Sequence, residues 1–334
     1  MSLAPLISVV IVTWNNAAHL TQCLSALSRQ TVQDFEIILV DNGSTDDAAA
    51  ELESRRAGLH VTIHRLPSNL GFAAANNIGA RLARGKWLAL LNADAYPDPD
   101  WLESLLNAAE RRPEFTFFAS RQVQYDHPAL LDGAGDAYHV SGLAWRQHYN
   151  QPVENYGLHE QEVFGACAAA AMYRKEGFLE AGGFDEAYFS YYEDVDLSFR
   201  LRLLGGRCLY VSGATVRHIG SASTGKNSGF TYYHIHRNLV WTFFKNMPAL
   251  LFWLFLPFHV ITNIYLSLRI LIKEGRWIAV KAKWDALRGL PAILRARKQA
   301  QAARRVSLRN LYRVMEKDLF APRRASHTRI REQQ

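Results

Sequence analysis

The chain has 334 residues, 49% of them apolar and 21% charged, a balance that excludes a disordered or low-complexity protein. The net charge of +7 is unevenly spread: residues 273–334 carry 17 Lys and Arg against 5 Asp and Glu, so the remainder is net acidic. Cys23, Cys167 and Cys208 are far apart and form no CxxC pair, which argues against a disulfide framework or a zinc site. We therefore expect a cytosolic protein with one large domain and a basic tail.

The first part of the chain alternates apolar β-branched runs with helical stretches. The first run has no basic residue before it and no small-residue cleavage site after it, unlike a secretory signal. The predicted strands are Ile7–Thr13, Glu36–Val40, Val61–Leu66 and Trp87–Leu91. The predicted helices are Ala18–Arg29, a short segment that ends at Arg56, and Ala73–Arg84. This alternation predicts an α/β fold with a mainly parallel, Rossmann-like sheet flanked by helices, and a crevice at the carboxyl ends of its strands.

The middle of the chain is less regular. Residues 121–160 mix Gly, His, Tyr and Asp, and we expect extended segments and loops over the crevice. Residues 191–196 are predicted to open a helix, because Leu197, Leu201 and Leu204 follow at helical spacing. Residues 207–211 are predicted as a strand, with His218 in a loop after it.

The composition changes after residue 246, where we expect a catalytic domain (1–246) to give way to a C-terminal helical region (247–334). Residues 249–268 lack formal charge and are long enough to span a bilayer, but Pro257, His259 and Asn263 interrupt them. Residues 277–288 place Trp and Leu at helical spacing beside Lys and Arg, as in a helix on an anionic membrane surface. Three arrangements remain open: on the membrane surface, packed on the catalytic domain, or spanning.

Four acidic or histidine residues fall at predicted strand ends or helix starts: Asp41, Asp94, Asp194 and His218. The apolar run 87–91 would deliver Asp94 to the sheet edge, where a divalent cation could bind. Each position also has a simpler interpretation, because Asp caps helices and a buried His can be satisfied structurally. Their joint occurrence at one predicted edge favours a catalytic site.

The order and spacing of seven motifs resemble those of the family 2 inverting glycosyltransferases of GT-A fold, most closely their rhamnosyltransferase-like branch. The resemblance covers about residues 6–245. The motifs are Val12–Asn15, Val40–Asp46, Asn69–Ala73 with Asn76 and Gly79, Leu91–Asp94, Gly182–Asp185, Glu193–Leu197 and His218–Gly220.

The resemblance implies a nucleoside diphosphate sugar donor. A carboxylate at the position of Asp41 would accept a hydrogen bond from the base N–H, which suits uracil or thymine and therefore a UDP- or dTDP-sugar. Gly71 would let the backbone approach the donor closely. The residues implied in donor binding are Thr13, Asn15, Asp41, Asn42, Ser44, Asn69, Gly71, Phe72, Asn76, Asn92 and Ala93.

The resemblance also implies a metal ion and a base. Asp94 and His218 would hold Mg²⁺ or Mn²⁺ against the leaving diphosphate. Asp194 would take the proton of the acceptor hydroxyl, while Asp196 points elsewhere. Acceptor-binding or orienting roles are expected for Glu193, Gly165, Ala166 and Arg237, with a structural role for Arg237 equally open.

The reaction expected from the resemblance is the transfer of one sugar, because the Gln-x-x-Arg-Trp pattern of processive synthases is absent. We expect L-rhamnose from dTDP-L-rhamnose and a saccharide or lipid-linked acceptor, at the cytoplasmic face of the cell membrane. A nucleotidyltransferase is disfavoured, because residues 13–17 lack the Gly and Lys of a phosphate loop. Nucleic-acid binding by the basic tail is disfavoured by its regularly spaced Trp and Leu. An inactive, nucleotide-sugar-binding relative remains an alternative.

Overall fold

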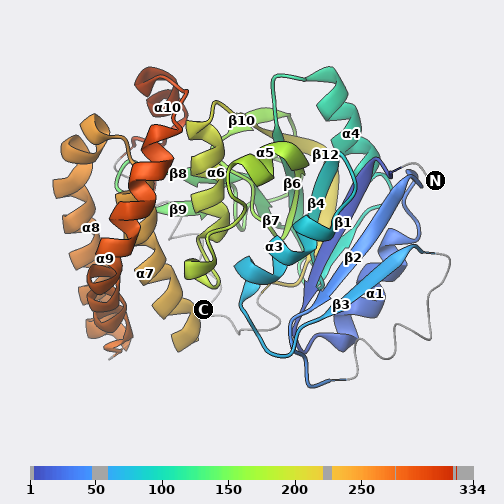
Figure 1. The fold of residues 1–334 in the computed structure, drawn as a ribbon, viewed down its shortest axis with the longest axis horizontal. Coiled ribbons are helices and arrows are strands. Elements are labelled where there is room, and N and C mark those ends of the chain that lie inside the picture. Colours follow the sequence, from blue (N-terminus) through green and yellow to red (C-terminus); the bar gives the residue numbers. More distant parts are fainter. Residues whose placement is uncertain (1–3, 47–58, 221–227, 275, 319–320, 322–334) are drawn as a thin grey trace.

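The structure is a computed structural model that describes residues 4–46, 59–220, 228–274, 276–318 and 321. The first half of its large sheet is parallel, with the strand order β4-β1-β2-β3. These strands are β1 (Ile7–Thr13), β2 (Phe35–Asp41), β3 (Val61–Arg65) and β4 (Trp87–Asn92). All four strands were predicted within about one residue, and Figure 1 shows their common direction. The predicted helix ending at Arg56 lies outside the described residues.

The second half of the sheet is mixed. β11 is antiparallel to both β4 and β6, whereas β12 runs parallel to β6. Short strands β5, β7 and β10 pair at its margins, and β8 and β9 form a separate hairpin. The strands are β5 (Ala95–Pro97), β6 (Phe117–Gln124), β7 (Leu131–Ala134), β8 (Asp136–Tyr138), β9 (Ala144–Arg146), β10 (Gln161–Val163), β11 (Ala170–Arg174) and β12 (Cys208–His218).

The predicted position of His218 in a loop is wrong. β12 does not stop at Val211: after a register shift its residues 215–218 pair again with β6, and His218 pairs with Ala95 of β5. The irregularity lies at Ser212 and Gly213, a polar break that ends an apolar run without ending the strand. His218 is therefore held by a strand directly beside the residue that follows Asp94.

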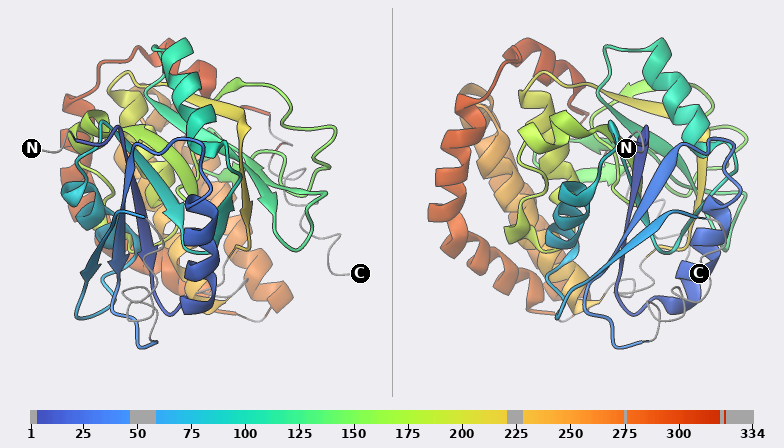
Figure 2. Two further views of the ribbon diagram at one scale, coloured as in Figure 1. Left: turned by 90° about the vertical axis from the view of Figure 1, so that its right-hand side faces the viewer. Right: turned by 45° about the vertical axis from the view of Figure 1, so that its right-hand side comes forward.

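Two helical layers cover the sheet. One core joins the odd-numbered side chains of β1 to α1 (Ala17–Leu27) and α4 (Trp101–Arg111). The second core joins the opposite face to α3 (Phe72–Leu82), α5 (Lys175–Glu180) and α6 (Glu193–Leu203). Figure 2 shows α1 and α4 on one side of the sheet and α3, α5 and α6 on the other.

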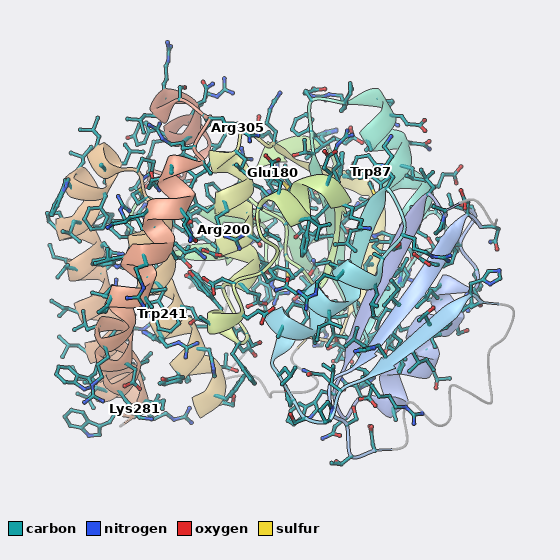
Figure 3. All side chains as sticks on the ribbon, viewed as in Figure 1. Trp87, Glu180, Arg200, Trp241, Lys281 and Arg305 are labelled. Carbon is teal, nitrogen blue, oxygen red and sulfur yellow. The ribbon has the colours of Figure 1, made fainter. Side chains whose placement is uncertain are left out.

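A third core lies beyond α6 and includes residues on both sides of position 246. It is built by α6 and the C-terminal helices α7 (Gly229–Asn246), α8 (Ala249–Glu274), α9 (Ile278–Ala302) and α10 (Leu308–Val314). Trp241 of α7 donates its indole N–H to the carbonyl of Ala286 in α9 at 3.0 Å, and Figure 3 shows it facing that helix. Arg305 forms an ion pair with Glu180 of α5 at 2.6 Å. The C-terminal helices thus pack directly on the α/β unit.

The outermost helix, α8, turns its apolar side outward. Trp253 is 70% exposed and Ile261 is 63% exposed, whereas the polar side chains of His259 and Asn263 are buried. Pro257 lies inside the helix without ending it. Among the described residues, α8 alone is long and apolar enough to cross a membrane, a test that some core helices also pass. Figure 1 shows it at the edge of the molecule opposite β3.

Candidate active site

The carboxyl ends of β1 and β2 carry the first group of predicted site residues. Thr13 and Asp41 are the last residues of adjacent parallel strands and stand in register. Both are buried, and the Thr13 hydroxyl has no hydrogen-bond partner among the described residues. The Asp41 carboxylate accepts the backbone N–H of Ser44 at 3.0 Å. Asn15 accepts the Thr45 N–H at 2.8 Å, so these two strand ends and the following turn form one bonded unit.

A second group connects β2 to the start of α3. The Asn42 amide donates to the Asn69 side chain at 2.9 Å and accepts the Leu70 N–H at 2.9 Å. Asn69 in turn accepts the Gly71 N–H at 2.8 Å. Gly71 has φ +88°, and a Cβ there would lie 2.6 Å from the Phe189 ring, so only glycine fits. The motif at residues 69–71 therefore shapes a tight turn beside Asp41.

The next two predicted donor residues lie on α3. Phe72 begins the helix, and its ring lies 6.1 Å from that of Phe184, between centroids. The Asn76 amide is buried and donates to the Phe72 carbonyl at 2.9 Å. The neighbouring Asn77 bonds both backbone groups of Phe184 at 2.8 Å, which fastens the Gly182–Asp185 motif to α3. Asn76 therefore has a partner within its own helix, whereas Asn77 joins the helix to a distant segment of the chain.

At the end of β4, Asp94 and His218 are brought together as predicted. Asn92 closes the strand, Ala93 is buried, and the Asp94 Oδ1 atom lies 3.4 Å from His218 Nε2. The other ring nitrogen, Nδ1, lies 2.7 Å from Oδ2 of Asp132. Burial alone would lower the pKa of His218, but its contacts with Asp132 and Asp94 raise it to about 9.

This corner fits a divalent cation. His218 is only 4% exposed, yet its Nε2 atom makes no hydrogen bond to any described residue. Two ligand atoms each about 2.1 Å from one ion lie about 3.0 to 3.4 Å apart, which matches the 3.4 Å between Nε2 and the Asp94 oxygen. A cation here would replace a proton on Nε2. No group of three or more candidate ligands occurs among the described residues, so a cation would need further ligands from a substrate or water.

The third group lies at the start of α6. Asp194 accepts the Ala168 N–H at 3.1 Å and the Val195 N–H at 2.8 Å. Burial raises the pKa of Asp194 despite those two N–H bonds and the positive charge of Arg146. Glu193 is buried beside it, and burial together with the Asp194 charge raises the pKa of Glu193 well above its usual value. Two carboxylates therefore share a poorly solvated position at a helix N-terminus.

A strained turn presents these two carboxylates. Phe189, Tyr191 and Tyr192 all have positive φ, between 65° and 68°, which non-glycine residues rarely adopt. The side-chain amide of Asn238, on α7, lies 2.7 to 3.0 Å from the carbonyls of Tyr188, Ser190 and Tyr191. Asn238 therefore holds the backbone that precedes Glu193.

The segment at residues 165–169 connects the corner that holds Asp94 and His218 to α6. Gly165 pairs with Asp136 of β8 through both backbone groups, and the Ala166 N–H points to the Ser198 hydroxyl at 3.4 Å. Ala168 binds Asp194, while the Ala169 carbonyl accepts the Asn92 N–H at 2.9 Å. Two adjacent residues thus bind the two sides of the site, which brings Asp194 and the Asp94 corner to one edge of the sheet.

Arg237 has the contacts of a structural residue. Its guanidinium donates to the carbonyls of Ala187 and Tyr188 at 3.0 and 2.9 Å, and it lies 4.3 Å from the centroid of the Trp241 ring. These bonds fasten α7 to the segment ahead of Glu193. Of the two roles left open for Arg237, the structural one agrees with these contacts.

Three charged residues near the site were not singled out from the sequence: Asp132, Asp136 and Arg146. The Arg146 guanidinium forms an ion pair with Asp132. Burial and the nearby Asp194 raise the pKa of Asp136 well above its usual value. All three come from β7, β8 and β9, short strands in a segment without hydrophobic periodicity. The Asp132-Gly-Ala-Gly-Asp136 spacing was the one signal that could have identified the two carboxylates.

Comparison with known proteins agrees with this geometry. The profile of glycosyl transferase family 2 matches residues 8–181. The N-acetylglucosaminyl-diphospho-decaprenol L-rhamnosyltransferase of Mycobacterium tuberculosis is 31% identical over 250 residues, covering 66% of this chain and 78% of the relative.

Two solved structures share the fold at lower identity. Staphylococcus aureus TarS 1–349 in complex with UDP-GlcNAc has a TM-score of 0.52 at 16% identity, over 92% of this chain and 83% of its own. The mannosyltransferase PcManGT of Pyrobaculum calidifontis, in complex with GDP-Man and Mn²⁺, has a TM-score of 0.53 at 17% identity, over 90% and 86%.

Proposed function

The chain belongs to glycosyl transferase family 2, has a GT-A fold and is a glycosyltransferase, and we propose that it transfers one L-rhamnosyl residue from dTDP-L-rhamnose to a lipid-linked saccharide with inversion. The observation that carries this proposal is that Asp94 lies 3.4 Å from His218, while the adjacent residues Ala168 and Ala169 bond Asp194 and Asn92 and so bring both groups to one edge of the sheet. The sugar and the lipid-linked acceptor are those named for the mycobacterial relative. UDP-sugars are the alternative donors.

The donor would lie along the ends of β1, β2 and β4. The buried Thr13 hydroxyl without a described partner and the Asp41 carboxylate beside it are suited to bonding the base. Ser44, Asn69, Gly71 and Phe72 would line the same pocket, with Asn92 and Ala93 at the diphosphate. The bonded unit of Asn15, Asn42 and Asn69 would hold this pocket in shape before the donor arrives.

Asp94 and His218 would hold the divalent cation, for which the 3.4 Å separation of their ligand atoms is suitable. Bound Mg²⁺ or Mn²⁺ would supply positive charge to the leaving diphosphate. An imidazole ligand favours Mn²⁺ over Mg²⁺ more than carboxylates alone do. Because only two side chains of the described residues meet here, we expect the cation to bind tightly only together with the nucleotide.

Asp194 would act as the base. Inversion requires the acceptor hydroxyl to attack from the face opposite the diphosphate, and a carboxylate within hydrogen-bond reach must accept its proton. Burial raises the pKa of Asp194, which increases its proton affinity, while the Ala168 and Val195 N–H groups keep it oriented. Glu193 would orient Asp194 or bind the acceptor beside Gly165 and Ala166.

The lipid-linked acceptor implies a membrane, and the C-terminal helices supply a surface for one. Exposed apolar residues recur along α8 at Leu250, Trp253, Leu254, Ile261 and Ile264, over the length of the helix. α9 adds exposed tryptophans with lysine and arginine between them, namely Trp277, Lys281, Trp284 and Arg288. This pattern suits the interface of an anionic bilayer at the cytoplasmic face of the cell.

The membrane proposal is tested with intact protein, because removal of residues 247–334 would uncover the core beneath α8 and α9. The double variant Trp253→Glu/Ile261→Glu should lose at least about 10-fold in binding to vesicles with anionic lipid, while donor hydrolysis is unchanged. Leu158→Glu, at an exposed apolar residue outside these helices, is the matched control. Vesicle binding equal to that of the wild type would refute the assignment of this surface.

The donor is tested by thermal shift and hydrolysis with dTDP-L-rhamnose, UDP-GlcNAc and GDP-mannose, each with Mn²⁺, Mg²⁺ or EDTA. We expect stabilisation and slow hydrolysis with dTDP-L-rhamnose in the presence of metal, a weaker response to UDP-GlcNAc, and none to GDP-mannose. A response to GDP-mannose alone would contradict the assignment of Asp41 to a uracil or thymine base.

A further inference from the structure

Asp132 lies directly behind His218, on the side away from Asp94. It belongs to β7, which pairs with β6, and β6 in turn pairs with the last residues of β12. Its Oδ2 atom is 2.7 Å from Nδ1 of His218, and its side chain is 9% exposed. The imidazole is therefore held between two carboxylates, with one ring nitrogen directed at each.

The Asp132 oxygen that faces His218 also binds Arg146. The guanidinium binds the same Oδ2 atom that faces His218, and it also reaches the Asp132 backbone carbonyl at 3.4 Å. Because a guanidinium has only N–H donors, the Oδ2 atom that it binds acts as a hydrogen-bond acceptor. The nitrogen that faces Asp132 must consequently carry a hydrogen.

This constraint determines what the other nitrogen can do. A neutral imidazole has one N–H and one lone pair, so an N–H at Nδ1 leaves the lone pair on Nε2. Nε2 is the atom that faces Asp94 and lacks a hydrogen bond among the described residues. Without Asp132, the ring could carry its hydrogen on either nitrogen, and it could also flip by rotation about the Cβ–Cγ bond. In half of those arrangements the nitrogen that faces Asp94 would carry a hydrogen and could not bind a cation.

We propose that Asp132 is a positioning residue that fixes the orientation and tautomer of His218, so that Nε2 and Asp94 together can bind a divalent cation. The inference rests on the proposed function, in which Asp94 and His218 hold that cation. Partners of this kind, hydrogen-bonded to the far nitrogen of a histidine ligand, typically change metal affinity 10- to 100-fold when they are removed.

The test is a calorimetric titration of Mn²⁺ into full-length protein saturated with dTDP, with Mn²⁺ into dTDP alone as the blank. The variants are Asp132→Ala, Asp132→Asn and His218→Ala. Glu162→Gln is the matched control, because Glu162 also pairs with arginines, Arg202 of α6 and Arg207 just before β12, and no hydrogen bond or ion pair joins it to a histidine among the described residues. Thermal unfolding of each variant reports whether it is folded.

We expect Asp132→Ala to weaken Mn²⁺ binding by about 10- to 100-fold. Asp132→Asn should lie between Asp132→Ala and the wild type, because its amide oxygen can still accept the Nδ1 hydrogen but carries no charge. Glu162→Gln should bind like the wild type. A purely structural role for Asp132 would lower the unfolding temperature without this graded loss of affinity.

Two results would overturn the inference and are distinguishable. If His218→Ala weakens Mn²⁺ binding while the folded Asp132 variants bind like the wild type, His218 is a ligand that needs no positioning by Asp132. If the wild type and His218→Ala bind Mn²⁺ equally, or neither binds it, the metal site of the proposed function fails as well. Should Asp132→Ala not fold, Asp132→Asn alone decides between these results.

Discussion

Two carboxylates of helix α6, Asp194 and Asp196, have opposite surroundings although they are two residues apart. The Asp196 carboxylate accepts bonds from Arg200, Lys245, Asn246 and Tyr188, all between 2.7 and 3.2 Å. Burial would raise the pKa of Asp196, but these cations and donors lower it to about 2. Among the described residues, two backbone N–H groups bond Asp194, the acidic Asp136 and Glu193 lie near it, and burial raises its pKa.

The difference separates a structural cluster from the one proposed to bind substrates. Around Asp196 positive and negative charges are balanced and each carboxylate oxygen is bonded, although the Asn246 Oδ1 atom has no hydrogen-bond partner among the described residues. At the sheet edge, acidic groups are in excess, and the Thr13 hydroxyl, the Glu193 Oε2 atom and the His218 Nε2 atom lack described hydrogen-bond partners. Such a site costs stability on its own and is expected where substrates complete the bonding.

The comparison is tested first at Asp194. Asp194→Asn keeps the size of the side chain but cannot accept the proton of the acceptor hydroxyl. We expect kcat for transfer to fall by about 10²- to 10⁴-fold while dTDP-L-rhamnose binds normally. Steady-state kinetics and donor titration measure the two quantities, and undiminished turnover would exclude Asp194 as the base.

The largest effect on stability is expected at the other carboxylate. Asp196→Ala leaves Arg200 and Lys245 buried without their shared partner, and we expect the free energy of unfolding to fall by about 3–5 kcal/mol. Urea unfolding measures it. Asp185→Ala, which removes a more exposed partner of the same Lys245, should cost about 1 kcal/mol or less. If Asp196→Ala and Asp185→Ala lost the same free energy of unfolding, the buried Asp196 would contribute no more to stability than the more exposed Asp185, which would contradict this account.

Acid should weaken the same cluster. The pKa of Asp196 is lower in the folded protein, about 2, than in the unfolded chain, so its contribution is fully present above about pH 4. This stabilisation is lost as the pH falls from about 4 to 2. A pKa difference of about two units between the folded and unfolded states corresponds to about 2–3 kcal/mol of unfolding free energy. Unfolding measured across this range should show a shallower decline in Asp196→Asn than in the wild type. Identical slopes would mean that Asp196 does not bind its cations as described.

The smallest change in free energy is expected at the corner that holds Asp94 and His218. Asp94→Ala removes one of two side chains proposed to hold the cation, and we expect donor affinity in Mn²⁺ to fall by about 10- to 100-fold, or about 1.4–2.7 kcal/mol. In EDTA, wild type and variant should bind the donor equally, because the lost interaction acts through the ion. A loss of the same size in EDTA would mean that Asp94 contacts the nucleotide directly.

Strand ends and helix starts account for what the sequence predicted correctly. Runs such as residues 7–13 and 87–91 have strong apolar periodicity, so the positions of Asp41 and Asp94 follow from where those strands stop. The expectation that Asp196 points elsewhere than Asp194 also rests on its place inside α6. Both kinds of prediction depend on contacts between residues that are near in sequence or in one regular element.

The remaining features depend on pairing between distant segments. Asp132, Asp136 and Arg146 lie on three- and four-residue strands whose sequence carries no alternation, and only the sheet brings them to His218 and Asp194. The continuation of β12 past Gly213 is likewise decided by its ladder with β6. For α8, composition indicated an apolar helix, but only its packing showed that the polar His259 and Asn263 face inward.

The configuration of the product tests the central claim most directly, namely that one carboxylate base, Asp194, acts opposite a metal-held diphosphate. The measurement is the NMR determination of the anomeric configuration of the sugar transferred from dTDP-L-rhamnose. A single displacement predicts the configuration opposite to that of the donor. Retention of the donor configuration would require a second displacement or a different geometry of attack, and it would contradict the role given to Asp194.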